Sequence, residues 1–85
     1  MAIVFVPPQL QRLTGAAQVE IEGSTVREVV EQMAQQFPGV GERLFDDGEL
    51  SPALQLSVDH MMTRALSTRV QSTTEVHFLP VIGGG

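Results

Sequence analysis

The hydrophobic residues of this sequence change their spacing at Gly23. Before that point they alternate or run together, as in β-strands, and after it they recur at the spacing of an amphipathic helix. Thr25 followed by Glu28 matches the capping box that begins many helices, and Pro38-Gly39 ends the pattern. Because such a helix must bury its apolar side, we expect it to cover one face of a sheet. The apolar stripe consists of Val26, Val29, Val30, Met33 and Phe37.

Four segments outside the helix have the apolar runs or the alternation of β-strands. The last of them contains Pro80, which implies a strand edge or a strand end. Residues 40–45 predict one short helical turn, and Asp59-His60 is a plausible β-turn. Residues 61–72 hold one short strand at most and give no clear pattern. The four predicted strands are residues 2–6, 18–22, 54–58 and 74–82.

The first and last strands are the most apolar, so we expect them to be the central pair of the sheet. They should run parallel, because a helical crossover separates them, whereas the first two strands should form an antiparallel hairpin across a long loop. This order predicts an α+β protein with the β-grasp fold: a mixed four- to five-stranded sheet with one main helix on one face. We expect residues 1–82 to form the domain and residues 83–85 to form a flexible glycine tail.

Composition narrows the possible functions. The chain has 85 residues, a net charge of -5, no cysteine and no lysine. Disulfides, thiolate metal sites and a nucleophilic thiol are therefore excluded, and the shortage of cations argues against nucleic-acid binding. No apolar run approaches the roughly 18 residues of a membrane span, so we expect a soluble, cytoplasmic protein. The acidic balance favours partners with basic docking surfaces, or serves solubility alone.

The remaining polar residues give weak signals for a metal or catalytic site. His60 and His77 lack further ligands at metal-binding spacing, so we expect a turn and a strand position for them and no metal. Asp46-Asp47-Gly48 could begin a calcium loop, but the other ligand positions are missing, and a turn is expected instead. Met61-Met62 is expected to serve local packing.

The β-grasp order together with a terminal Gly-Gly resembles the ubiquitin-like sulfur carriers. This family includes the small subunit of molybdopterin synthase, the thiamine-pathway sulfur carrier and the carrier of a thiocarboxylate route to cysteine. The resemblance covers nearly the whole chain, and its motifs are specific by their order and spacing. They are Pro7, Leu10, Thr14-Gly15, Gly23-Ser24-Thr25-Val26, Pro38-Gly39, Glu42-Arg43-Leu44, Val58-Asp59, Leu79-Pro80 and Gly84-Gly85.

The resemblance implies a protein co-substrate that is not itself an enzyme. The carboxylate of Gly85 would be adenylated by an E1-like partner that uses ATP, and then converted to a thiocarboxylate. Gly83 and Gly84 would let the tail lie extended in the partner's active site. A desulfurase or rhodanese-type protein would supply the sulfur and a synthase subunit would accept it, with no cofactor held tightly by the chain. Molybdopterin, thiamine and cysteine biosynthesis all stay open as pathways.

Two other functions remain open at this point. The first is a ubiquitin-like protein modifier joined to lysines of other proteins through Gly85, although a chain without lysine cannot form isopeptide polymers on itself. The second is a β-grasp binding module whose glycine tail is inert, as frayed termini often are. The upstream strand and helix pattern favours the sulfur carrier over both.

Alternation along the central strands predicts a docking surface. If Val4, Val6, Val76 and Phe78 face the helix, then Ile3, Phe5, His77 and Leu79 lie on the other face of the sheet. Apolar side chains grouped on an open face suggest a partner interface. The opposite parity, or a cover formed by residues 61–72, would remove it. The predicted docking residues are Phe5, Leu79, Val81 and Ile82.

Overall fold

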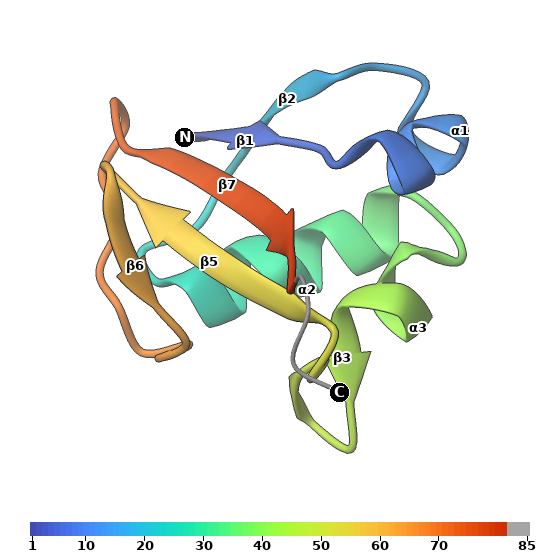
Figure 1. The fold of residues 1–85 in the computed structure, drawn as a ribbon. Helices are drawn as coiled ribbons and strands as arrows, with labels where there is room; N and C mark the ends of the chain where they lie inside the picture. The colour runs from blue at the N-terminus through green and yellow to red at the C-terminus, as the bar shows by residue number, and fades with distance from the viewer. Residues whose placement is uncertain (82–85) are drawn as a thin grey trace.

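The computed structural model describes residues 1–81 of the chain (Figure 1). Strand β1 (Ala2–Phe5) leads through a 3₁₀ helix, η1 (Pro8–Leu10), and a short helix, α1 (Gln11–Thr14), into β2 (Gln18–Ile21). The main helix, α2 (Val26–Gln36), is followed directly by α3 (Val40–Leu44). The remaining strands are β3 (Phe45–Asp46), β4 (Glu49–Leu50), β5 (Leu54–Val58), β6 (Met61–Thr63) and β7 (Glu75–Pro80).

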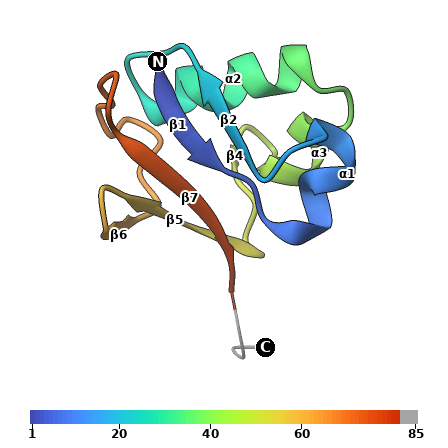
Figure 2. The same cartoon turned by 90° about the horizontal axis from the view of Figure 1, so that it is seen from above.

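Five of these strands form one mixed sheet in the order β2-β1-β7-β5-β6. Strands β1 and β7 are parallel neighbours, as predicted for the first and last strands, and the other neighbouring pairs are antiparallel. The helices lie on one side of this sheet, while β3 and β4 form a small hairpin of their own (Figures 1 and 2). The predicted α+β, β-grasp arrangement is therefore confirmed.

The core lies between the sheet and α2. Val4 and Val76 are neighbours on the two central strands and are fully buried, and Phe78 is nearly so. Every second residue of β5 is buried as well, so that strand also turns its apolar side chains toward the helix. The face parity predicted for Val4, Val6, Val76 and Phe78 is thus confirmed. From α2, the buried residues are Val26, Val29, Val30 and Met33.

The N-terminus of α2 is held by its own cap and by the segment before β7. Thr25 Oγ1 accepts a hydrogen bond from the backbone N–H of Glu28, as the capping box predicts. The Glu28 carboxylate, however, accepts from the backbone N–H of Ser24 at 2.9 Å, one residue before the cap. Carbonyls of Leu66 and Thr68 accept the next free N–H groups of the helix. These contacts satisfy donors that a helix start leaves unpaired.

Helix α2 ends where the chain turns sharply into α3. Gly39 has φ of 92°, a left-handed conformation that suits glycine, and it begins the short helix predicted for residues 40–45. Gly41 of α3 lies against Ala34 of α2: a Cβ added at Gly41 would come within 2.8 Å of the Ala34 Cβ. The absence of a side chain at Gly41 lets the two helices approach closely.

Two local features differ from the sequence expectations, and a third decides between two alternatives. The predicted loop between the first two strands contains η1 and α1, where Pro8 occupies the start of η1 and Leu10 is buried. Residues 45–50 form the β3–β4 hairpin around the predicted turn, in which Asp47 and Gly48 both have positive φ. Of the two positions predicted for Pro80, the strand end is confirmed, because Pro80 is the last residue of β7. The edge position is wrong, because β7 is the central strand of the sheet.

Candidate functional site

The exit of the chain from the sheet is the first part of the candidate site. Strand β7 reaches the rim of the molecule beside the start of β5, where Pro80 pairs with Leu54 (Figure 2). The N–H of Val81 then donates to the carbonyl of Ala53 at 2.9 Å. Ile82, Gly83, Gly84 and Gly85, which include the predicted reacting carboxylate, lie outside the described residues.

The sheet face turned away from α2 is the second part. Ile3, Phe5 and His77 are half-buried there, and Leu79 is exposed. The Phe5 ring stacks on the His77 imidazole, with a centroid distance of 4.1 Å. His77 Nε2 lies 3.6 Å from Glu75 Oε1. The predicted face assignment is therefore confirmed, and it brings Phe5 and Leu79 onto one open surface with His77 between them.

The predicted alternative cover does not lie on this face. Residues 64–73 run instead along the start of α2, where the Leu66 and Thr68 carbonyls accept helix N–H groups. Leu66 and Val70 of this segment are buried in the core that faces the helix. The segment thus closes the helix side of the molecule and leaves the opposite sheet face open.

The exposed side chain of Met62 extends the open face beyond the predicted docking residues, whereas Met61 pairs with the buried Val58 and lies on the other side of the sheet. Register places Met62 beside Ser57, and Ser57 beside His77, so one row of side chains crosses from β7 to β6. Met62 is 56% exposed and Met61 is 73% exposed, more than Leu79 at 38% and Val81 at 39%. One short strand was expected within residues 61–72 without being assigned to particular residues, and the expected turn at Asp59-His60 followed by a returning strand is the signal that could have placed Met62. The expected local packing of Met61-Met62 is wrong, because both side chains are exposed.

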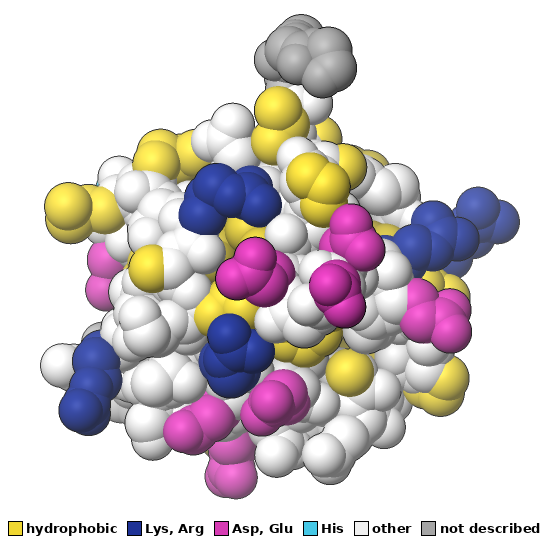
Figure 3. All heavy atoms as spheres, turned by 90° about the horizontal axis from the view of Figure 1, so that it is seen from below, with side chains coloured by type: hydrophobic (Ala, Val, Ile, Leu, Met, Phe, Trp, Pro, Cys, Tyr) yellow, Lys and Arg dark blue, Asp and Glu magenta, His cyan; other side chains and the backbone are white. Residues whose placement is uncertain are grey.

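A hollow of about 610 Å³ lies where this face meets the chain exit. Val81 and Met62 bring apolar surface to it, and Arg64 brings a positive charge. In the space-filling view, hydrophobic side chains gather at the upper rim of the molecule, whereas arginine and acidic side chains are mixed across the middle (Figure 3). The hollow is lined by Pro52, Gln55, Met62, Thr63, Arg64 and Val81.

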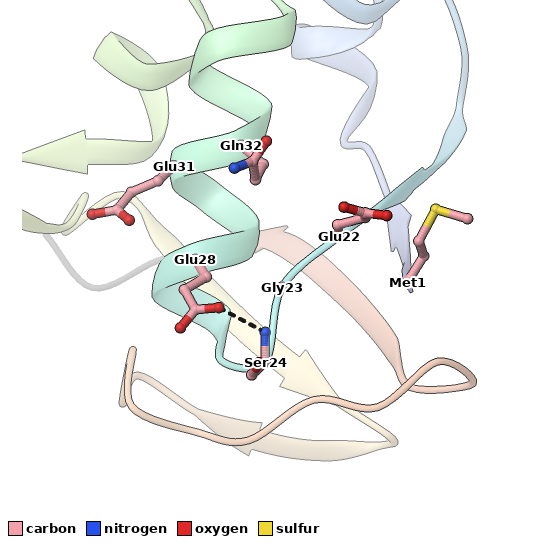
Figure 4. A pocket seen from close by; sticks show the side chains of 7 residues that line it. All are labelled: Met1, Glu22, Gly23, Ser24, Glu28, Glu31 and Gln32. Atoms are coloured by element: carbon pink, nitrogen blue, oxygen red, sulfur yellow. Dashed lines mark hydrogen bonds between the residues drawn. The ribbon is translucent and has the colours of Figure 1, made fainter.

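A second hollow of about 600 Å³ lies between α2 and the ends of β1 and β2 (Figure 4). Three carboxylates border it, but Glu28 points to the Ser24 N–H that it caps, and Glu22 and Glu31 do not converge with it on one point. Within residues 1–81, no group of three or more potential metal-binding side chains comes together. The hollow is lined by Met1, Glu22, Gly23, Ser24, Glu28, Glu31 and Gln32.

The weaker sequence candidates have structural positions. His60 occupies the turn between β5 and β6 with φ of 71°, and His77 lies on strand β7, as expected for both. Asp47 forms the turn of the β3–β4 hairpin, which agrees with the expected turn. Among the described residues, no helix has the length and apolar character of a membrane span.

Solved structures with the same fold cover the chain from end to end. CysO in the Amycolatopsis orientalis BexX/CysO complex has a TM-score of 0.90 at 26% identity, with full coverage of both chains. Mycobacterium tuberculosis CysO, described as an antigen, has the same TM-score and identity and covers 96% of this chain and 100% of its own. Small archaeal modifier protein 1 of Methanosarcina acetivorans shares the fold, with a TM-score of 0.85 at 19% identity and coverages of 99% and 95%.

No curated protein sequence matches the chain significantly. A family model does: the one described as "ThiS family" matches residues 4–85, which span the sheet, the helix and the terminal glycines. The resemblance to ubiquitin-like sulfur carriers is thereby confirmed, and the chain belongs to the ThiS family.

Proposed function

We propose that this protein is a sulfur carrier, a co-substrate whose reactive group is the carboxylate of Gly85. The observation that carries the proposal is the ThiS family match, which extends through Gly83, Gly84 and Gly85. The fold supports it, because the segment that leads to these glycines leaves from the central strand of the sheet. A central strand gives the terminal segment a fixed starting point, and glycines without side chains suit the delivery of a carboxylate into a narrow active site.

The chemistry needs activation, because a carboxylate is a poor electrophile. In the proposed reaction, a Gly85 carboxylate oxygen attacks the α-phosphorus of ATP and pyrophosphate leaves. The terminal sulfur of a persulfide on a desulfurase or rhodanese-type donor then attacks the carbonyl carbon of the acyl-adenylate, and AMP leaves. A thiol next attacks the donor's sulfur in the acyl disulfide that has formed, which releases the C-terminal thiocarboxylate and leaves a disulfide between the donor and that thiol. The resulting thiocarboxylate passes its sulfur to an acceptor on a synthase subunit. ATP is used by the E1-like partner, and the catalytic groups belong to the partners.

The open face supports recognition by these partners. Phe5 and Leu79 lie on one surface beside the exposed Val81, and we propose that the E1-like enzyme and the sulfur-accepting subunit dock there. Ile82 belongs to the same proposed surface by its place in the sequence and lies outside the described residues. One neighbour, CysO, was solved in complex with BexX, which favours a partner-binding role for this fold.

The proposed acceptor belongs to cofactor, cysteine or other metabolite biosynthesis. Molybdopterin, thiamine and cysteine routes all use a carrier of this kind, and a cytoplasmic location is part of the proposal because the activation consumes ATP. The chain itself holds no tightly bound cofactor in this scheme. Genes adjacent to the coding sequence would identify the acceptor.

Intact-protein mass spectrometry tests the proposal. The chain is incubated with an E1-like enzyme from the same genome, ATP and a sulfide source, with a sample lacking ATP as control. A mass gain equal to the replacement of one oxygen by sulfur supports the carrier. Conjugates to lysines of other proteins would instead favour a ubiquitin-like modifier. An unchanged mass under conditions that activate a known carrier would leave an inert binding module.

A further inference from the structure

The segment between β4 and β5 is held by one arginine. Arg64, just after β6, donates from Nη1 to the carbonyl of Leu54 and from Nη2 to the carbonyls of Leu50 and Ser51, at 3.2 Å and 3.4 Å. Leu50 belongs to the small β3–β4 hairpin, whereas Leu54 belongs to the main sheet. A planar guanidinium with five donors can bridge several carbonyls at fixed angles, which an ammonium cannot do. Arg64 thus joins the hairpin to the sheet.

The same segment anchors the end of the central strand. Pro80 is the last residue of β7 and has no N–H to donate to its neighbour Leu54. The next donor along the chain is the N–H of Val81, which bonds to the Ala53 carbonyl at 2.9 Å. The position of Ala53 therefore determines where the end of the strand is fixed, and Ala53 lies within the loop that Arg64 holds.

Ser51 makes the other hydrogen bonds of the loop. It donates its N–H to the Leu44 carbonyl at the end of α3, its Oγ accepts the N–H of Ala53, and its carbonyl accepts the N–H of Leu54 at 3.0 Å. These bonds shape the loop backbone, and among the described residues Arg64 alone donates side-chain hydrogen bonds to both of its ends, Leu50 and Leu54. Arg64 also lines the 610 Å³ hollow together with Val81, so the guanidinium and the chain exit share one site.

We propose that Arg64 is a positioning residue that fixes the point at which the chain leaves the sheet. By holding residues 50–54, it fixes the Ala53 carbonyl, and through it Val81. This inference rests on the proposed function, because a fixed exit matters for activity only if the carboxylate beyond it reacts. Loosening the exit enlarges the range of directions that the lead to the active site can take, which lowers the fraction in reactive geometry.

The test compares Arg64→Ala and Arg64→Lys with the wild-type protein. Arg69→Ala is the matched control, because this substitution removes the same charge from an exposed position. The Arg69 side chain makes no hydrogen bond to the described residues. Amide hydrogen exchange at Val81 measures the anchor directly and needs no partner. In Arg64→Ala it should become about tenfold faster, while the core amides of Val4 and Val76 stay protected.

The second readout is pyrophosphate release with the E1-like enzyme and ATP, below the unfolding transition of every variant. For Arg64→Ala we expect kcat to fall by about threefold to tenfold with KM for the carrier within about twofold, since the docking residues Phe5 and Leu79 are unchanged. The kcat of Arg64→Lys should lie between those of Arg64→Ala and the wild-type protein, and the kcat of Arg69→Ala should equal that of the wild type. A purely structural role would leave kcat unchanged at this temperature.

The outcomes separate the two proposals. Unchanged Val81 exchange in Arg64→Ala overturns the anchoring role, and faster exchange with unchanged kcat overturns the positioning role. If the wild-type protein is never activated, the proposed function fails, and the positioning role fails with it even where the exchange result shows that Arg64 anchors the strand end.

Discussion

The aromatic ring of Phe5 lies parallel to the imidazole of His77, with ring centroids 4.1 Å apart and 6° between the ring planes. The two residues are direct partners in the parallel pair of β1 and β7, so the stack joins the first strand of the chain to the last. It also explains why Phe5 is half-buried on a face that no other element within residues 1–81 covers, because His77 shields one side of its ring.

Replacing Phe5 by Asp should block activation while the protein stays folded. The change removes the stack and half-buried apolar area, which should cost about 1–2 kcal/mol of unfolding free energy. The new charge would have to be desolvated in any interface formed by the open face. Circular dichroism and thermal unfolding measure the fold, and intact mass after incubation with the E1-like enzyme measures activation.

Gln35→Asp is the control for this change, because it adds the same charge on the exposed side of α2. Leu79→Asp provides a second test on the open face at a residue that is more exposed than Phe5. Normal activation of both face variants would contradict the docking assignment. Loss of the folded state in Phe5→Asp alone would show that Phe5 serves mainly as core.

The predictable parts of the fold are the segments whose apolar residues recur at regular spacing or form a continuous run. Helix α2 could be predicted because Val26 and Met33 belong to one apolar stripe, and β1 and β7 because their runs are strongly apolar. The residues that form strand β6 could not be assigned, because all three are polar or exposed and their pairing with β5 depends on a turn and not on their own pattern. For the same reason Met62 and Arg64, which border the candidate site, were missed.

Replacing His60 by Gly should stabilise the protein. Asp59 and His60 both have positive φ, 47° and 71°, in the turn between β5 and β6. The left-handed conformation costs a residue with a Cβ about 1 kcal/mol. Glycine avoids this cost, but part of the gain is lost because glycine has more conformational freedom in the unfolded chain. The net gain should be about 0.5 kcal/mol, or a Tm rise of roughly 2–4 °C, measurable by calorimetry.

Asp59 should be kept in this variant, because its carboxylate accepts the N–H of Glu75 at 2.9 Å. Ser57→Gly is the control, since it places glycine in the neighbouring strand β5, where it should destabilise. A lower Tm for His60→Gly would mean that the histidine side chain makes a stabilising contact that outweighs its backbone strain.

Replacing Gly41 by Ala should destabilise the packing of α3 on α2. The added Cβ would come within 2.8 Å of the Ala34 Cβ, so the helices must separate, at a cost of about 1–3 kcal/mol. Denaturant unfolding measures the loss. In the Ala34→Gly background, the same substitution should cost far less, because the opposing Cβ is gone. Equal costs in the two backgrounds would show that the close approach does not determine the effect.

Changing the end of the chain should abolish activation without changing stability. Deleting Gly84-Gly85 removes the proposed reacting carboxylate, and appending one bulky residue after Gly85 places a side chain where the proposed active-site slot admits only backbone. Neither change touches the buried core of residues 1–81, so the unfolding free energy should stay within about 0.5 kcal/mol of wild type. Appending a single Gly is the matched control: it moves the carboxylate by one residue without adding a side chain. Sulfur gain by the bulky variant, with its mass showing that the added residue is still present, would contradict the free-carboxylate mechanism.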